Sequence, residues 1–255
     1  MILTIEIGNS TITLGGVEGE EICFECRINT DRVKTSDTYC IDLKTLLEIY
    51  GIGLDTIEGV IIASVVPQVL NSVRTAIRKL LGKEPIVVGP GIKTGLDIRL
   101  ENPSQMGAGL VAADVAALAE HKPPMIIIDM GTATTISVVD ENQNFIGGMI
   151  MPGLMVSRDA MSAKAAQLPQ ISLEAPKKTI GRNTVDCMRS GIIYGTASTI
   201  DGAIRHIEEE LGQSCTVVST GGLSALVTPH CKRKVIQDSD LLLKGMMILY
   251  RKNQV

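Results

Sequence analysis

The sequence predicts a duplicated α/β fold in which two related halves face a shared cleft. A buried apolar strand, residues 126–130, carries an acid near its end and is followed by glycine and small hydroxyl residues up to Thr135. A similar stretch occupies residues 5–12, at a constant offset of about half the chain. The aligned pairs are Glu6 with Asp129, Gly8 with Gly131 and Thr11 with Thr134. Two strand–turn–strand openings, each followed by helices and further strands, favour two α/β domains over a helical bundle or a single parallel sheet.

A strand that ends in such a turn presents backbone N–H groups, hydroxyls and one carboxylate to a ligand. The N–H and hydroxyl groups can hold phosphate oxygens, and the acid can hold the cation that neutralises them, so the turns predict a metal-bound polyphosphate. A carboxylate at the end of an apolar strand is costly to bury without a cation or donors, which makes Asp129 a candidate metal ligand. Glu6 is a second candidate, with a solvated acid as its alternative. The candidate phosphate-binding residues are Glu6, Gly8, Asn9, Ser10, Thr11, Gly131, Thr132 and Thr134.

Composition narrows the class of ligand. The 255 residues are 45% hydrophobic and 20% charged, with a mean hydropathy of +0.24, which indicates a well-packed globular protein. A net charge of −4 and the absence of tryptophan argue against a nucleic-acid-binding surface. No apolar run reaches the length of a membrane span, and the chain enters a strand at once, so a cytoplasmic location is expected. The six scattered cysteines include one C-x-x-C pair without a second pair, which favours free thiols over a zinc site.

In the first half, apolar alternation and turn residues predict three strands joined by tight turns, then alternating helices and strands. Gly8–Ser10 is the first turn, and a helix starting near Asp37 stops at Gly51 because glycine commonly ends helices. The expected strands are 2–7, 11–17, 22–28, 60–66 and 85–88, and the second expected helix is 68–81.

The second half repeats this plan after an alanine-rich helix at 112–120 and the break at Pro123-Pro124. The expected strands are 125–129, 134–139, 145–151 and 215–219, with helices at about 184–211 and at 241–252. We expect domains at 1–115 and 116–255, with the last helix packing back on the first domain. The methionines at 149, 151, 155 and 161 are expected in the core or in a dimer interface.

Seven short motifs in order along nearly the whole chain resemble those of the type III pantothenate kinases, which have the duplicated ribonuclease H-like, actin-like fold. Asp129–Thr134 resembles the family's second phosphate motif, and Thr220-Gly221-Gly222 resembles its glycine turn beside the adenosine. The other matching segments are 8–10, 63–67, 102–103 with 107–108, 147–153, and 181–184 with 190–191.

This resemblance implies ATP-dependent phosphorylation of the pantothenate hydroxyl, the first step of coenzyme A biosynthesis. It also implies Mg²⁺, a monovalent cation (K⁺ or NH₄⁺) near Asp129, and a homodimer that shares its pantothenate pocket. By the same resemblance, Gly221 and Gly222 are ATP-binding residues. The implied substrate-binding residues are Gly107, Ala108, Gly109, Leu110 and Thr184, although a helix cap explains Thr184 equally well.

The chain departs from the family pattern on the acceptor side. Gly109-Leu110 replaces an aspartate that acts as general base and an arginine that can grip a carboxylate. Leu100 stands where the family has a tyrosine, and Glu6 where the first motif opens with aspartate. Loss of a general base typically costs roughly 10²- to 10⁴-fold in rate. The sequence therefore leaves open a kinase of reduced activity, a non-catalytic nucleotide-binding paralogue with a regulatory or partner role, and an ATPase of the same fold.

Overall fold

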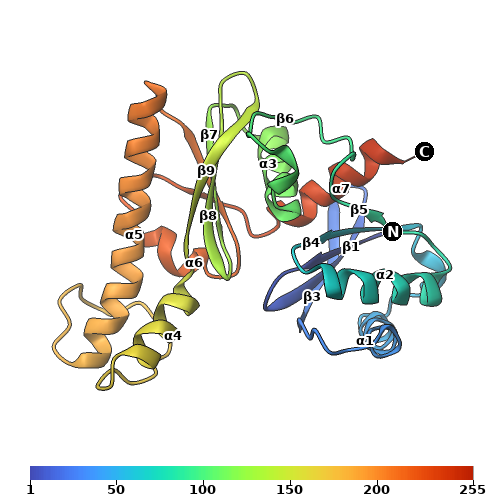
Figure 1. The fold of residues 1–255 in the computed structure, drawn as a ribbon, viewed down its shortest axis with the longest axis horizontal. Helices are drawn as coiled ribbons and strands as arrows, with labels where there is room; N and C mark the ends of the chain where they lie inside the picture. The colour runs from blue at the N-terminus through green and yellow to red at the C-terminus, as the bar shows by residue number, and fades with distance from the viewer. Residues whose placement is uncertain (255) are drawn as a thin grey trace. The chain divides into compact units, whose positions relative to one another are not determined.

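The structure is a computed structural model that describes residues 1–254, and the chain divides into two compact units. Unit 1 contains Met1–Leu96, Glu101–Ala116 and the segment from Leu241 onward; unit 2 contains Asp97–Leu100 and Ala117–Asp240. Each unit is built on a mixed sheet with helices; in Figure 1 the strands of unit 1 are blue to cyan, and its segments after residue 100 are green and red. A domain boundary at residue 115 stays a prediction.

The sheet of unit 1 has the order β3-β2-β1-β4-β5. Strand β1 is central: it pairs antiparallel with β2 and parallel with β4, so three strands form a meander and two follow helices. The expected strands are therefore present, with β4 ending at Ser64 because Pro67 opens the next helix. The strands are β1 (Ile2–Ile7), β2 (Thr11–Glu18), β3 (Glu21–Asn29), β4 (Gly59–Ser64) and β5 (Ile86–Val87).

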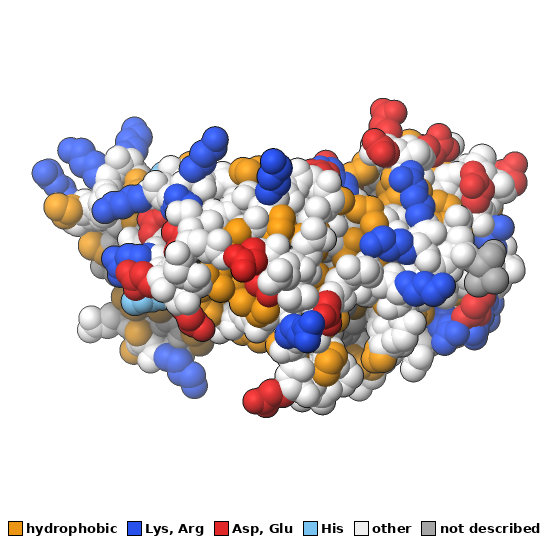
Figure 2. Space-filling view, turned by 90° about the horizontal axis from the view of Figure 1, so that it is seen from above, with side chains coloured by type: hydrophobic (Ala, Val, Ile, Leu, Met, Phe, Trp, Pro, Cys, Tyr) orange, Lys and Arg blue, Asp and Glu red, His pale blue; other side chains and the backbone are white. Residues whose placement is uncertain are grey.

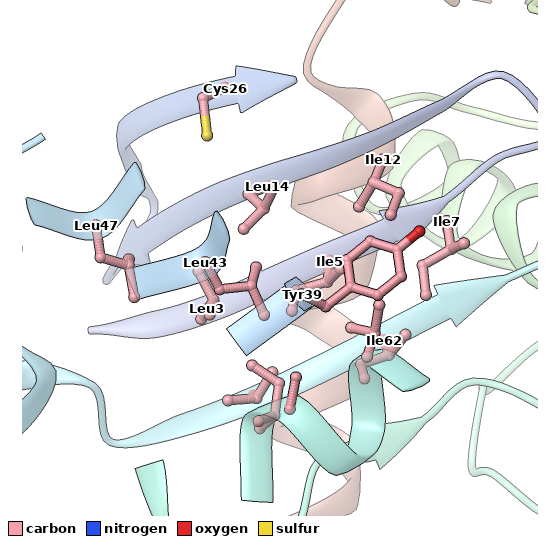
Figure 3. Packing of buried hydrophobic residues seen from close by; sticks show 14 of the residues in the cluster. Leu3, Ile5, Ile7, Ile12, Leu14, Cys26, Tyr39, Leu43, Leu47 and Ile62 are labelled. Atoms are coloured by element: carbon pink, nitrogen blue, oxygen red, sulfur yellow. The ribbon is translucent and has the colours of Figure 1, made fainter. Parts of the chain in front are cut away.

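Helices α1 (Ser36–Ile49) and α2 (Pro67–Leu81) cover one face of this sheet. Figure 3 shows Tyr39, Leu43 and Leu47 of α1 pointing toward Leu3 and Ile5 of β1, and all five are buried. The opposite face is covered by α7 (Leu241–Asn253), which lies so close that a Cβ on Gly15 would be 2.8 Å from Leu243.

The sheet of unit 2 repeats the order, as β11-β10-β7-β8-β9, with β6 added beside β9. Strand β7 takes the place of β1, with antiparallel β8 on one side and parallel β10 on the other. The duplicated organisation expected from the two turns is confirmed. The strands are β6 (Asp97–Ile98), β7 (Met125–Met130), β8 (Ala133–Val139), β9 (Asn144–Pro152), β10 (Thr216–Thr220) and β11 (Ile236–Gln237).

One long helix, α5 (Thr184–Leu211), covers a face of this sheet (Figure 1). Its side chains Ile193 and Ile200 are fully buried with Ile126 and Ile128 of β7. The region near 184–211 is thus a single helix of 28 residues, ended by Gly212 at φ 69. Two shorter helices, α4 (Leu154–Lys164) and α6 (Ser224–Val227), complete the unit.

The structure corrects the prediction for α3 (Ala108–Glu120), which begins before the expected residue 112. The glycine-rich start favoured a loop, because glycine costs about 1 kcal/mol relative to alanine in a helix. Tertiary packing outweighs this preference: Ala112 is fully buried, and a Cβ on Gly245 of α7 would be 1.8 Å from its carbonyl oxygen. The two-residue strands β6 and β11 were not expected, since such short segments have no readable period.

Among the described helices, none has the length and apolar character that crossing a membrane requires. On the face shown in Figure 2, basic and acidic side chains are interspersed and do not form one field of a single sign. All six cysteines lie in the described part of the chain and are free thiols, with Cys23 exposed and Cys26 buried.

Candidate phosphate and substrate sites

Asp129 lies at the end of β7, one residue before the strand finishes. In the ladder it is opposite Thr135 of antiparallel β8 and Thr220 of parallel β10. Directly paired residues point to the same face of a sheet, so a carboxylate lies in one row between two hydroxyl side chains. The turn that follows is closed by the Gly131 N–H, which donates to the Ala133 carbonyl at 3.0 Å.

Burial raises the pKa of the Asp129 carboxyl to about 6. No donor or cation among the described residues offsets this effect, so the ionised carboxylate carries an uncompensated desolvation cost. No cluster of three or more acidic, histidine or cysteine side chains that could hold a metal occurs within residues 1–254. Asp129 therefore fits a hard cation that takes its other ligands from phosphate oxygens and water, as Mg²⁺ does in phosphate sites.

Gly221, directly after β10, lies against Asp129. Its φ is +91°, and a Cβ at this position would be 2.6 Å from Asp129 Oδ1 and 2.6 Å from the Met130 nitrogen. Only glycine permits both the conformation and the close approach. The Ser224 N–H and hydroxyl donate to the Gly221 carbonyl at 3.1 and 2.8 Å, which fixes the turn 221–222 at the start of α6. The structure thus brings the predicted glycine turn and the predicted metal ligand together within unit 2.

We expect the substitution Gly221→Ala to destabilise the protein by about 2 kcal/mol or more, because a strained backbone and a steric clash add. Urea unfolding followed by circular dichroism measures the change. The matched control is Gly202→Ala in α5, where a Cβ has no neighbour within 4 Å. That variant should gain up to about 1 kcal/mol, and equal stability of both variants would contradict the close packing at Gly221.

Gly131 and Thr132 form the turn itself and are exposed. The segment before α4 packs on them: the Gly153 N–H donates to the Thr132 carbonyl at 3.2 Å, and a Cβ on Gly153 would be 2.5 Å from the Gly131 carbonyl oxygen. The glycine at 153 therefore lets the first turn of α4 approach the turn at 131–132. Helix N-termini favour anions, so this contact adds partial positive charge beside the turn.

Thr134 has a different position from the one expected. It is opposite Met130 in the ladder and is only 1% exposed, with its hydroxyl buried on the face that packs against α5. The first turn is one residue longer, since Ile7 pairs with Ile12 whereas Met130 pairs with Thr134. In the ladder, Ala133 rather than Thr134 is therefore the counterpart of Thr11. The structure does not bring the Thr134 side chain to the turn.

The turn of unit 1 contains Gly8, Asn9 and Ser10 between β1 and β2. The Gly8 N–H donates to the Thr11 carbonyl at 2.9 Å, and Asn9, Ser10 and Thr11 are all exposed. The Glu6 carboxylate bends back over this turn, because a Cβ on Gly8 would be 3.1 Å from Glu6 Oε1. These five predicted residues thus gather at one end of β1, as a phosphate site requires.

The residues predicted to bind the acceptor lie in both units. Gly107, Ala108, Gly109 and Leu110 form the start of α3 in unit 1. A Cβ on Gly109 would meet only Leu242, at an ordinary 3.7 Å, so glycine is not sterically required there.

Thr184 opens α5 in unit 2 and lines a cavity of about 600 Å³ with Cys187, Gly191 and Ser157. The helix cap is the neighbouring Asn183, whose side chain accepts from the Asp186 N–H at 2.9 Å. The cap therefore accounts for Asn183, and Thr184 is left as a cavity residue.

The candidate site residues expected from the sequence did not include Thr135, Thr220 and Gly153, although Thr220 and Gly153 lie in matched motifs. If the pairing of β8 with β7 had been predicted, Thr135 would have been placed opposite Asp129 and on the same face of the sheet. The Gly153 contact is tertiary, and no local pattern predicts it.

The two units have the duplicated sheet order of the ribonuclease H-like, actin-like fold. The fold resembles that of the 2-hydroxyisocaproyl-CoA dehydratase activator from Clostridium difficile with bound ADPNP, with a TM-score of 0.56 and 14% identity over 99% of this chain and 94% of that one. It also resembles the ROK hexokinase from Thermus thermophilus, with a TM-score of 0.54 and 10% identity over 99% of each chain. These likenesses show the fold alone.

The family model for type III pantothenate kinase matches residues 2–206. A type III pantothenate kinase from Exiguobacterium sp. (strain ATCC BAA-1283 / AT1b) is 42% identical over 254 residues, which cover 100% of this chain and 100% of that relative. The chain belongs to the type III pantothenate kinase family.

Proposed function

We propose that this protein is an ATP-dependent kinase that phosphorylates pantothenate, the first step of coenzyme A biosynthesis. The observation that carries the proposal is the half-buried carboxylate of Asp129, whose pKa is raised by desolvation, next to the Gly221 turn, in a chain that matches the family along its length. A biosynthetic kinase of this kind would work in the cytoplasm.

In the proposed reaction, the bond between the terminal phosphorus of ATP and its bridging oxygen breaks, and a bond to the pantothenate hydroxyl oxygen forms. In unit 2, Asp129 would hold Mg²⁺; in unit 1, Glu6 is a candidate cation ligand; and K⁺ or NH₄⁺ would be a further cation. Bound Mg²⁺ neutralises charge on the phosphates. Gly131, Thr132 and the turn Gly8–Thr11 would bind phosphate oxygens, while Gly221 and Gly222 would lie on the nucleotide side.

Gly107–Leu110 and Thr184 would contact the acceptor. Gly109 has no side chain that accepts a proton, so the hydroxyl proton would pass to water. Phosphoryl transfer depends mainly on positioning and charge neutralisation, and turnover can therefore persist at a reduced rate.

A coupled ADP-release assay with Mg²⁺, K⁺ and millimolar pantothenate tests the function, with mass spectrometry to identify phosphopantothenate. We expect ADP release that requires pantothenate. ADP release of equal rate without pantothenate would indicate an ATPase, and saturable ATP binding without any turnover would indicate a non-catalytic protein; either result overturns the proposal.

We further propose that the protein is a homodimer that buries an apolar surface of unit 2. Five large apolar side chains on β9 and the start of α4 are substantially exposed, and Ile150 is 79% exposed. An exposed apolar surface of this kind is typical of a protein interface. The set consists of Ile146, Met149, Ile150, Met155 and Val156.

We expect Ile150→Glu to shift the protein from dimer to monomer in analytical ultracentrifugation, because a charge would have to be desolvated in the interface. Ile41→Glu on the exposed side of α1 is the control and should leave the mass unchanged. A monomeric wild-type protein at micromolar concentration would contradict the proposed dimer.

A further inference from the structure

The loop that follows β3 is fastened to the phosphate turn of unit 1. The Thr30 N–H donates to the Ser10 carbonyl at 2.9 Å, and the Thr30 hydroxyl donates to the Gly8 carbonyl at 2.7 Å. Two residues later, the Arg32 guanidinium donates to the side-chain oxygen of Asn9 at 3.2 Å. A cationic side chain is thus held at the turn by one of the turn's own residues.

The same loop is fixed from its other side by α1. The fully buried Tyr39 donates its hydroxyl proton to the Asp31 carbonyl at 2.6 Å and accepts from the Asp31 N–H at 3.2 Å. The Asp31 carboxylate accepts from the Val33 N–H at 2.8 Å. Backbone on both sides of Arg32 is therefore bonded, and its side chain starts from a defined position, which lowers the entropic cost of binding a ligand.

Arg32 differs in its partner from the other arginine nearby on the chain. Arg27 on β3 forms an ion pair with Glu25 at 2.7 Å, whereas the hydrogen bond from Arg32 goes to a neutral amide. A guanidinium has five N–H donors in a planar fork, and such forks match phosphate oxygens bidentately. An exposed guanidinium whose hydrogen bond goes to a neutral amide, beside the turn proposed to bind phosphate, fits an anionic ligand.

We propose that Arg32 is a phosphate-binding residue, oriented by Asn9, that contacts the terminal phosphate of ATP at the turn Gly8–Ser10. This inference rests on the proposed kinase function and extends its site to a residue outside the motifs of the turns. Arg32 forms no covalent bond in the reaction. It neutralises charge on the terminal phosphate oxygens while the bond to the bridging oxygen breaks.

Calorimetric titration with ATP and with ADP tests the contact on wild-type protein and on Arg32→Ala. Because the contact is to the terminal phosphate, we expect the Kd for ATP to rise about ten-fold or more and the Kd for ADP to change much less. Arg32→Lys should recover part of the ATP affinity, since it restores the charge but not the fork. Arg27→Ala is the matched control and should leave both constants within about two-fold, as expected for an exposed ion pair.

Two further measurements separate ligand contact from a structural role. Guanidinium at millimolar concentration should restore part of the turnover of Arg32→Ala. Asn9→Ala keeps the backbone N–H of the turn and removes only the side chain that orients Arg32, so it should weaken ATP binding, and the double variant should lose less than the sum of the two single losses. Equal ATP affinity of Arg32→Ala and Arg27→Ala would overturn the assignment of Arg32. If the wild-type protein releases ADP equally fast without pantothenate, while Arg32→Ala still loses affinity for ATP but not for ADP, the kinase function alone is overturned. A wild-type protein that binds no ATP would overturn both proposals.

Discussion

Asp129→Asn should strongly lower kinase turnover and at the same time stabilise the metal-free protein. Removal of the charge that holds the cation should lower turnover roughly 10²- to 10³-fold, because metal neutralisation of the phosphates is worth several kcal/mol. The gain in stability has a separate cause: burial disfavours the ionised carboxylate, as its pKa of about 6 indicates.

The sign of the pH dependence follows from that shift. The folded pKa of about 6 lies above the ordinary aspartate value of 3.8, so the metal-free protein loses stability as pH rises between these values, and above them this group changes the stability no further. The loss is roughly 3 kcal/mol. A buried amide has its own desolvation cost of about 1–2 kcal/mol, so a net gain of about 1–2 kcal/mol should remain in the asparagine variant at pH 7.5.

Urea unfolding in the presence of a chelator, at pH 4.5 and pH 7.5, measures the difference between wild type and Asp129→Asn. Asp140→Asn is the control, since burial raises the pKa of the Asp140 carboxyl but hydrogen bonds from Asn144 and Asn142 outweigh burial and leave that pKa lowered. That variant should lose stability and keep turnover. An Asp129→Asn protein that is less stable than wild type at pH 7.5 would show that the carboxylate is compensated.

The strands and the duplication could be predicted because they depend on short-range patterns. β1 and β7 are both apolar runs that carry an acid near the end and lead into a glycine turn. Each is the central strand of a sheet with the same strand order. The pairing register of the strands on either side of each turn was harder to predict. The two turns differ by one residue, and a shift of one residue moves a side chain to the other face of the sheet. This is why the threonine at position 134 is buried while the sequence alignment had equated it with the exposed Thr11.

Contacts between distant segments account for what the sequence could not supply. Gly221 and Gly153 each approach the unit 2 turn from another part of the chain, and no local pattern encodes those approaches. The start of α3 was missed because helix propensity argues against Gly109, whereas packing of α3 on α7 decides its conformation. Arg32 lies in a polar loop whose function becomes visible only through its bond to Asn9.

The double substitution Gly109→Asp with Leu110→Arg should increase pantothenate turnover. An aspartate at 109 would supply a proton acceptor, for which a gain of roughly 10²-fold or more is expected. An arginine at 110 would offer a bidentate partner for the pantothenate carboxylate and lower its KM. The site admits the change, because a Cβ on Gly109 meets only Leu242 at 3.7 Å and because an acid in the first turn of α3 interacts favourably with the helix dipole.

The two roles separate in the kinetics. Gly109→Asp alone should raise kcat and leave the KM for pantothenate nearly unchanged, while Leu110→Arg alone should lower KM. Gly109→Ala is the steric control: it adds the Cβ without the carboxylate and should change neither constant. Unchanged kcat in a folded, ATP-binding Gly109→Asp variant would mean that proton removal does not limit the reaction. In that case the wild-type rate would be set by the positioning of ATP and acceptor, and glycine at this position would cost the enzyme little.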